Sequence, residues 1–312
     1  MDESRRIERR VTLHDLRVLM SVIGAGSMGR AARQLATSQP AISRSIADLE
    51  HTLGARLLDR SARGIEPTPY GRALLARGTV MFDELRQGIM DLKVLANPTS
   101  GEVSIGASIA IAQGLVSSVI SRVAQRYPGL SFRVLASDTA TASRALLDRK
   151  VDFAVVHIIE PLAEEPLDIE PLLHDPFVVI AGAQNPLTRR RRLALADLLN
   201  QPWALPLPDQ PYGAVAREAF RASGADFPII RVGSTLPVRT ALLATGPFLS
   251  MAPRIVMQFP PENRLLKTLR VDLPATARPL ALVTLKNRTL NPAAHLVMDR
   301  MRATAKLLAK ES

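Results

Sequence analysis

The chain contains no cysteine, and this absence removes several kinds of chemistry at once. Disulfide bonds, thiolate nucleophiles and zinc–thiolate sites all need that residue. A chain without disulfides suits a reducing cytoplasm. The sequence also lacks any run approaching 18 uninterrupted apolar residues, and its first residues, MDESRRIERR, lack the apolar segment of a secretory signal. We therefore expect a soluble, cytoplasmic protein that does not enter a membrane.

Most motifs of common enzymes are missing as well. The five histidines show neither H-x-H nor H-x-x-x-H spacing, so no metal site is predicted, and there is no Walker lysine motif and no G-x-S-x-G. The one enzymatic hint is VIGAGSMGRAA, in which Gly24, Gly26 and Gly29 have the G-x-G-x-x-G spacing of a dinucleotide-binding loop. An NAD(P)-dependent dehydrogenase is therefore the alternative to be weighed.

The amounts of apolar and basic residues define the broad class. A chain of 312 residues with 47% apolar content can form two domains with real cores. Its net charge of +11 favours a polyanionic partner such as nucleic acid. Residues 1–70 carry eleven arginines against eight acids, which leaves only +3. The positions of the charged residues, more than their net number, must therefore decide whether the chain binds nucleic acid.

The segment before the three glycines has the periodicity of a helix. A dinucleotide loop needs a strand there, but Leu13, Leu16, Leu19, Met20 and Ile23 fall on one helical stripe. We therefore expect the glycines to end this helix in a turn.

The segments after the glycines are also helical. A second helix capped by Ser27 can run only to about Ala36, because Thr37-Ser38-Gln39-Pro40 supplies a new cap and a helix-starting proline. Asp48 and Glu50, at the distance of a ribose-binding acid, fall within a third helix. Three helices joined by short turns predict a helix-turn-helix DNA reader over about residues 27–46.

The third helix separates an apolar face from a face of polar and small residues. On the polar face, Gln39 can bridge adenine N6 and N7, and Arg44 can pair with guanine or phosphate. Ser38 caps the helix and leaves its first amides facing a phosphate. The residues expected to contact DNA from these two helices are Arg30, Arg33, Ser38, Gln39, Pro40, Ser43 and Arg44. An ordinary solvated face would look similar, so this face alone leaves the question open.

A predicted hairpin after the third helix favours DNA binding. Gly54 ends the helix, and residues 56–60 and 65–68 then form two short strands around a turn. Arg60 and Arg63 fall near its tip, where a wing can place arginines on phosphates or in the minor groove.

The stretch SMGRAARQLATSQPAISRSIADLEHTLGARLLDR resembles the LysR-type transcriptional regulators, through S-Q-P-A-x-S-R, L-E-x-x-L-G and a wing arginine. This resemblance implies a winged helix-turn-helix over residues 11–68. It also implies groove contacts from the third helix and a wing contact from Arg60. The sequence departs from the family at Leu58, usually phenylalanine, and at Pro67, usually leucine.

Residues 69–96 are predicted to form one long linker helix, capped by Thr68. Its apolar residues repeat at heptad positions over three heptads, with Gly78 as a weak point. The predicted dimerisation seam consists of Leu75, Phe82, Leu85, Ile89 and Leu92. Packing on the chain's own domain is the alternative. A homodimer or homotetramer would match a double-stranded operator with a two-fold repeat.

Residues 102–312 are predicted to form a bilobal α/β effector-binding domain, after a hinge at 97–101. Lobe I comprises about 102–174 and 276–312, and lobe II about 175–275. The predicted strands are 103–107, 131–136, 151–156, 177–181, 203–205, 229–233 and 248–251. Alternation with helices favours parallel sheets, with a cleft between the lobes. The arginine run 189–192 is expected to be an exposed loop.

Polar residues at predicted strand ends are candidates for binding a small effector in that cleft. A helix cap explains each serine or threonine equally well. The candidates are Ser108, Thr139, His157, Ser234 and Thr235, with the loop from Pro206 to Tyr212 as a cover.

The family resemblance implies a fold similar to type 2 periplasmic binding proteins and ligand contacts at Ser108 and Thr139. HDPFVVIAGAQNPL and VTLKNRTLNPAAHLV further resemble the subgroup typified by galactose-binding-protein regulators, which suggests a sugar or small carboxylate inducer. We therefore expect an effector-controlled transcriptional regulator without a cofactor, not an enzyme.

Overall fold

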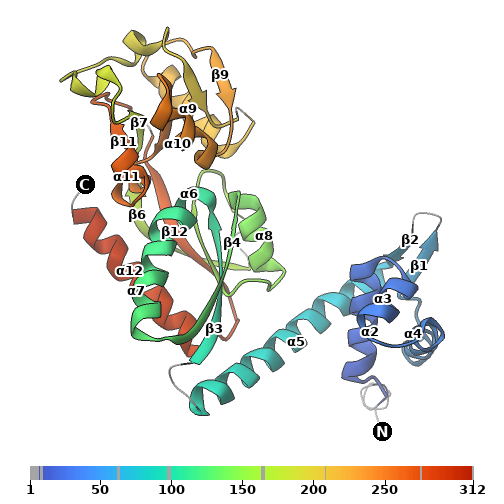
Figure 1. Ribbon diagram of the computed structural model, residues 1–312. Coiled ribbons are helices and arrows are strands. Elements are labelled where there is room, and N and C mark those ends of the chain that lie inside the picture. Colours follow the sequence, from blue (N-terminus) through green and yellow to red (C-terminus); the bar gives the residue numbers. More distant parts are fainter. Residues whose placement is uncertain are drawn as a thin grey trace. The chain divides into compact units, whose positions relative to one another are not determined.

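The structure is a computed structural model that describes residues 7, 10–61, 64–96, 100–162, 166–207, 209–274 and 276–310. For residues 60–61, 93–96, 100 and 230–231 it describes the backbone only. The chain forms two compact units, residues 1–86 and 87–312. The boundary between them falls inside helix α5 (Pro69–Ala96), which is labelled in Figure 1.

Unit 1 is a small helical domain with a two-stranded antiparallel sheet, as the sequence predicts. Its elements before α5 are α2 (Leu13–Ala25), α3 (Met28–Gln34), α4 (Gln39–Leu53), β1 (Leu58–Ser61) and β2 (Gly64–Pro67). Its core joins Val18 and Val22 of α2 to Ile42 and Ile46 of α4. Leu13, predicted to belong to the core stripe, is instead 45% exposed, because the buried face of α2 turns toward Val18 and Val22.

The glycine motif of unit 1 is a bend between two helices. Helix α2 runs through Gly24 to Ala25, and Gly26 ends it in the left-handed conformation, with φ of 62°. That conformation suits a residue without Cβ. The side chain of Ser27 then caps α3. A helix, not a strand, therefore precedes the glycines, and the dinucleotide-loop interpretation is wrong.

Unit 2 consists of two lobes, each built on a five-stranded mixed sheet (Figure 1). Lobe I has the strand order β4-β3-β5-β12-β6. Its elements are β3 (Ser100–Ser108), α6 (Ile109–Ile111), the π-helical turn Ala112–Val116, α7 (Ser117–Arg126), β4 (Gly129–Ser137), α8 (Thr139–Leu147), β5 (Phe153–His157), β6 (Leu167–Asp175), β12 (Arg278–Leu285) and α12 (Pro292–Lys310).

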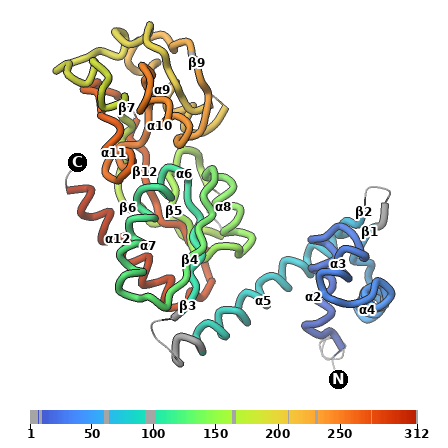
Figure 2. Tube along the Cα trace, viewed as in Figure 1, coloured from blue at the N-terminus to red at the C-terminus, as the bar shows by residue number. Residues whose placement is uncertain are grey.

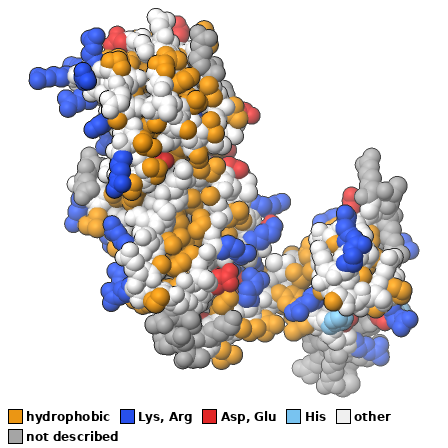
Figure 3. Space-filling view, viewed as in Figure 1, with side chains coloured by type: hydrophobic (Ala, Val, Ile, Leu, Met, Phe, Trp, Pro, Cys, Tyr) orange, Lys and Arg blue, Asp and Glu red, His pale blue; other side chains and the backbone are white. Residues whose placement is uncertain are grey.

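Lobe II has the strand order β11-β7-β10-β8-β9. Its strands and α-helices are β7 (Phe177–Gly182), β8 (Trp203–Leu205), α9 (Pro211–Ala222), β9 (Ile230–Gly233), α10 (Leu236–Thr245), β10 (Leu249–Pro253), α11 (Glu262–Leu265) and β11 (Leu266–Thr268). Short 3₁₀ helices cover Pro186–Arg189, Leu195–Leu198 and Arg254–Gln258. The arginines 189–192 are exposed, as predicted, and Figure 3 shows a group of basic side chains at one edge of this lobe.

The expectation of parallel sheets holds only for part of each lobe. Strands β3, β4 and β5 pair in parallel, but β12 runs antiparallel between β5 and β6. The chain enters lobe II after Asp175 and returns before Arg278, so lobe I contains both early and late residues (Figure 2). The sequence-based strand assignment missed β6, β11 and β12.

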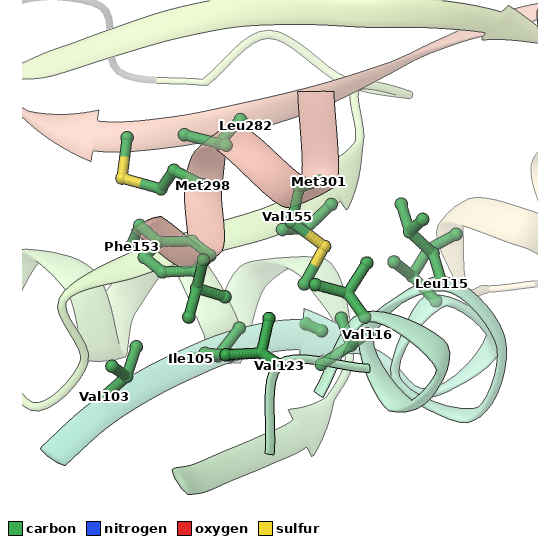
Figure 4. Packing of buried hydrophobic residues seen from close by; sticks show 14 of the residues in the cluster. Val103, Ile105, Leu115, Val116, Val123, Phe153, Val155, Leu282, Met298 and Met301 are labelled. Atoms are coloured by element: carbon green, nitrogen blue, oxygen red, sulfur yellow. The ribbon is translucent and has the colours of Figure 1, made fainter. Parts of the chain in front are cut away.

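Helix α12 completes the core of lobe I from the end of the chain. Met298 and Met301 pack on Phe153 and Val155 of β5 and on Leu282 of β12 (Figure 4). These contacts hold the sheet of lobe I in place. Its strands β3 and β5 both end on the side of lobe II. The fold thereby positions Ser108 and His157, the last residues of those strands.

Candidate functional sites

The first candidate site is the exposed face of α4. Ile42, Ile46 and Leu49 are at most 3% exposed and form the side of the helix that faces the core. On the other side Gln39, Pro40 and Arg44 are exposed and Ser43 is half-buried, in the arrangement that the helical angles predict. This second face carries an amide, a hydroxyl and a guanidinium, which are groups that can hydrogen-bond to base edges.

Caps fix both ends of the segment that carries this face. The hydroxyl of Ser38 accepts a hydrogen bond from the amide of Ala41 at 3.3 Å, and Pro40 lies in the first turn of α4. Gly54 ends the helix with φ of 66°. Arg30 and Arg33 are exposed on α3, where the hydroxyl of Ser27 accepts a hydrogen bond from the amide of Arg30.

Asp15 joins α2 to α4 from behind. The amide and hydroxyl of Thr12 donate to its Oδ2 at 3.0 and 2.7 Å, and the hydroxyl of Ser45 donates to its Oδ1 at 3.2 Å. Partial burial alone would raise the pKa of Asp15, but these hydrogen bonds outweigh it and hold the pKa below its ordinary value.

Glu50 joins α4 to the wing. Its Oε1 accepts hydrogen bonds from the amides of Leu57 and Leu58, at 2.7 and 3.2 Å. Leu58 is the first residue of β1, so this carboxylate has a structural partner in place of the ribose that a dinucleotide loop would require. The predicted wing is present as the β1–β2 hairpin, with Arg60 paired to Ile65. The side chain of Arg60 and the whole of Arg63 lie outside the described residues.

The predicted seam on α5 divides into two parts. A Cβ added to Gly78 would lie 3.4 Å from Sδ of Met20, and Phe82 receives the guanidinium of Arg17 at 5.1 Å from its ring centroid. The first part, with half-buried Leu75 and Phe82, thus includes contacts with α2 of the same chain. The second part is open to solvent. Its exposed residues are Leu85, Ile89 and Leu92.

The second candidate site is a cavity of about 270 Å³ in unit 2, between the two lobes. Lobe I contributes the ends of β3 and β4, and lobe II contributes the starts of α9 and α10. The lining residues are Ser108, Ile109, Ala110, Ser137, Asp138, Thr139, Pro206, Gln210, Pro211, Tyr212, Ser234, Thr235, Leu236 and Arg239. With Pro206 and Tyr212, the ends of the predicted covering loop, seven residues were expected to bind the effector; six of them line this cavity, and His157 does not.

His157 lies behind the cavity wall and is fully buried, so its place in the predicted site needs correction. Its Nε2 lies 2.9 Å from Oδ2 of Asp175, and its Nδ1 lies 2.8 Å from the hydroxyl of Tyr212. The same hydroxyl lies 3.2 Å from Oγ of Ser108. Both imidazole nitrogens are therefore hydrogen-bonded within the protein, and the ring does not line the cavity.

This hydrogen-bonded chain connects the two lobes. Ser108 and His157 belong to lobe I, and Tyr212 belongs to α9 of lobe II. Asp175 lies where the chain leaves lobe I, and its Oδ1 accepts a hydrogen bond from the amide of Ile255 at 3.1 Å. Burial raises the pKa of Tyr212 above its ordinary value, so its phenol is a stable neutral hydrogen-bonding group.

Arg239 also lines the cavity, although the sequence-based search missed it. It is 3% exposed, and its Nη1 donates to Oγ of Ser250 at 2.7 Å and to the carbonyl of Met251 at 2.8 Å. A signal was available in the sequence. With Leu236, Thr240 and Leu243, Arg239 has the spacing of the buried stripe of α10, where a charged side chain is unexpected.

Among the described residues, no group of three or more histidine, cysteine, aspartate or glutamate side chains is placed to hold a metal ion. None of the described helices is long and apolar enough to cross a membrane.

Comparison with protein families gives two matches that together span most of the chain. Residues 13–72 match the bacterial regulatory helix-turn-helix protein, lysR family, and residues 96–306 match the LysR substrate binding domain. The first match contains α2 to β2, and the second contains both lobes.

Two curated relatives cover nearly the whole chain. The HTH-type transcriptional regulator GbpR of Azospirillum brasilense is 27% identical over 305 residues, which is 96% of this chain and 88% of the relative. The SDS degradation transcriptional activation protein of a Pseudomonas strain is 31% identical over 295 residues, or 92% of this chain and 95% of the relative.

Solved structures share the fold. A full-length OxyR variant from Pseudomonas aeruginosa has a TM-score of 0.66 at 19% identity and covers 95% of each chain. CbnR in complex with its target DNA has a TM-score of 0.54 at 20% identity and covers 95% of this chain and all of that one.

Proposed function

The chain belongs to the LysR family of bacterial transcriptional regulators, and on this premise we propose that α4 reads the operator through its exposed face. As a member of this family it is a DNA-binding transcriptional regulator with an effector-binding domain. The observation that carries the proposal is the division of α4, whose Ile42 and Ile46 are buried while Gln39 and Arg44 are exposed. A helix held in this way can enter a major groove without breaking its own core.

Each exposed group has a defined role in this proposal. Gln39 hydrogen-bonds to an adenine edge and Arg44 pairs with a guanine. Pro40 and Ser43 contact the DNA between these two bases. Arg30, Arg33 and the capped start of α4 at Ser38 hold phosphates and fix the register. Arg60 and Arg63 of the wing contact the neighbouring backbone or minor groove.

The open part of the α5 seam supports a dimer. Leu85, Ile89 and Leu92 are large apolar side chains that α5 leaves in water, and pairing with a second α5 would bury them. Phe82 contributes less than the heptad pattern predicts, because α2 already covers part of it. The dimer, alone or doubled into a tetramer, matches an operator with a two-fold repeat.

The cavity between the lobes is proposed to hold a small effector. Its wall combines apolar surface with the polar groups of Ser108, Thr139, Tyr212, Ser234 and Thr235, a combination common to small-molecule sites. The similarity to GbpR, with the two C-terminal stretches, supports an inducer that is a sugar or a small carboxylate. We propose that the chain acts by binding rather than by catalysis, in the cytoplasm where its DNA lies.

Arg44→Ala tests the reading face. Fluorescence anisotropy with a duplex from the DNA flanking the gene should show a loss of about 1–3 kcal/mol in operator binding and a weaker preference for the operator over a scrambled duplex. The matched control is Arg77→Ala on α5, which removes another exposed arginine from unit 1. Unchanged operator binding by Arg44→Ala would refute the proposed reading face.

A further inference from the structure

Arg239 places a buried positive charge in the wall of the effector cavity without an acidic partner among the described residues. Within the described residues, its hydrogen bonds go to the neutral oxygens of Ser250 and Met251. Its Nε is buried and has no hydrogen-bond partner in the described part of the chain. Burial lowers the pKa of Arg239 to about 10, which leaves the guanidinium charged at neutral pH. A buried cation of this kind is costly unless an anion joins it.

The N-terminus of α10 faces the same space. Thr235, Leu236 and Arg239 all line the cavity, and α10 is 10 residues long. Within the described residues, the side chain of Thr235 makes no capping hydrogen bond to this helix. Pro237, the second residue of α10, has no amide hydrogen, so the first turn offers an anion the amide hydrogens of Leu236 and Val238 together with partial positive charge.

The one acidic side chain in the described cavity wall is already engaged. Asp138 caps α8, where its Oδ1 accepts a hydrogen bond from the amide of Thr141 at 2.8 Å and its Oδ2 accepts one from the Thr141 hydroxyl at 2.7 Å. Asp138 is exposed and belongs to lobe I, whereas Arg239 is buried and belongs to lobe II. Asp138 therefore forms no ion pair with Arg239.

We infer that the effector is a small organic carboxylate, whose charged end binds between Arg239 and the N-terminal amides of α10. This inference rests on the proposed effector role of the cavity and selects one of its two ligand classes. A neutral sugar would leave the buried guanidinium without a counter-charge. A carboxylate supplies that charge and accepts hydrogen bonds from both the guanidinium and the helix amides.

Thermal unfolding of the full chain with matched acids and amides tests this inference. Propionate and benzoate, at constant ionic strength, should raise the unfolding midpoint by about 2–4 °C, because a ligand that binds only the folded state stabilises it. Propionamide, benzamide and D-galactose should not. An equal effect of acid and amide, or no effect of either acid, overturns the inference.

Two substitutions assign the effect to this site. Arg239→Met and Thr235→Asp should each abolish the response to benzoate, the first by removing the cation and the second by placing a carboxylate at the start of α10. Aspartate is also a favourable helix cap, so Thr235→Asp should keep the domain folded even where Arg239→Met does not. Arg302→Met, which breaks the ion pair with Glu170 outside the cavity, should respond like the wild type. A benzoate response that survives in Thr235→Asp contradicts the inference.

The outcomes separate this inference from the proposed function. Stabilisation by D-galactose in place of the acids would keep the effector cavity and overturn its carboxylate specificity. Operator binding is measured without any of these compounds. A failure to bind the operator would therefore count against the proposed function and leave the carboxylate result standing.

Discussion

At the scale of single residues, Asp15 connects α4 to α2. Its carboxylate accepts hydrogen bonds from Thr12 at the start of α2 and from Ser45 in the middle of α4. Three donors on one ionised side chain stabilise its charged form relative to the unfolded chain. The position of α4 thus depends on a group that titrates in acid.

Asp15→Asn should lower the free energy of unfolding of unit 1 by about 1 kcal/mol at neutral pH, since a helix cap and a link to α4 are both weakened. The folded pKa of Asp15 lies below the unfolded one. Its contribution is therefore complete above the unfolded value of about 4 and is lost as the pH falls through the folded value. Urea unfolding followed by far-UV circular dichroism at several pH values measures this.

The exposed Asp48 of α4 provides the control. Asp48→Asn changes the same charge on a neighbouring helix without removing a link to α2. If the two variants were equally stable at pH 7, Asp15 would have no structural role of the kind described.

Single residues that act on their own neighbours in the chain could be predicted from the sequence. Ser27, Ser38 and Gly54 cap the helices expected of them, because a cap involves only the three or four residues directly after it at the start of a helix or before it at the end. The roles of Glu50 and Arg239 lie beyond this range. The amides that bond to Glu50 are seven and eight residues away, across the turn at Gly54. The partners of Arg239 in β10 are eleven and twelve residues away, so only its place on the buried stripe of α10 was visible in the sequence.

At the scale of elements, α5 carries an apolar surface that the chain itself covers only in part. Leu85 is 45% exposed and Ile89 is 48% exposed, and their spacing of four residues places them about one turn apart on the same side of the helix. The double variant Leu85→Glu, Ile89→Glu should convert a dimer into a monomer in analytical ultracentrifugation. It should also weaken operator binding, because two linked reading heads bind more tightly than one.

Arg77→Glu is the control for this double variant, because it adds acidic charge to α5 away from the seam. An unchanged sedimentation coefficient in the double variant would show that the exposed surface of α5 is not the dimer interface.

The helices were easier to predict than the sheets. Helix α4 carries its apolar repeat within 15 residues and has its caps directly before and after them, so local sequence defines it. Strand β12 pairs with β5 and β6, which lie more than 100 residues earlier. No pattern in the sequence around β12 indicates such a partner. Strand β6 contains Pro171 and lies at the edge of its sheet, where a proline is tolerated but weakens the strand pattern.

At the scale of the whole of unit 2, a series of hydrogen bonds joins the two lobes. It runs from Asp175 through His157 and Tyr212 to Ser108. Tyr212→Phe removes the hydroxyl in the middle and leaves a nitrogen of His157 buried without its partner. We expect the free energy of unfolding to fall by about 1–3 kcal/mol. Fluorescence of Trp203, the single tryptophan and a buried residue of lobe II, reports the transition in urea.

Tyr127→Phe is the matched control, because the Tyr127 hydroxyl makes no hydrogen bond to the described residues. Equal midpoints for the two variants would show that the hydroxyl of Tyr212 adds nothing to the union of the lobes.

The link between α4 and the wing through Glu50 has a consequence for the choice of operator. Because Glu50 hydrogen-bonds the start of β1 to α4, we expect the hairpin to move together with this helix. If α4 and the hairpin contact DNA as proposed, the number of base pairs between their two contact points is therefore expected to be fixed by the protein. A single base pair inserted between those two points would force the regulator to give up one of them.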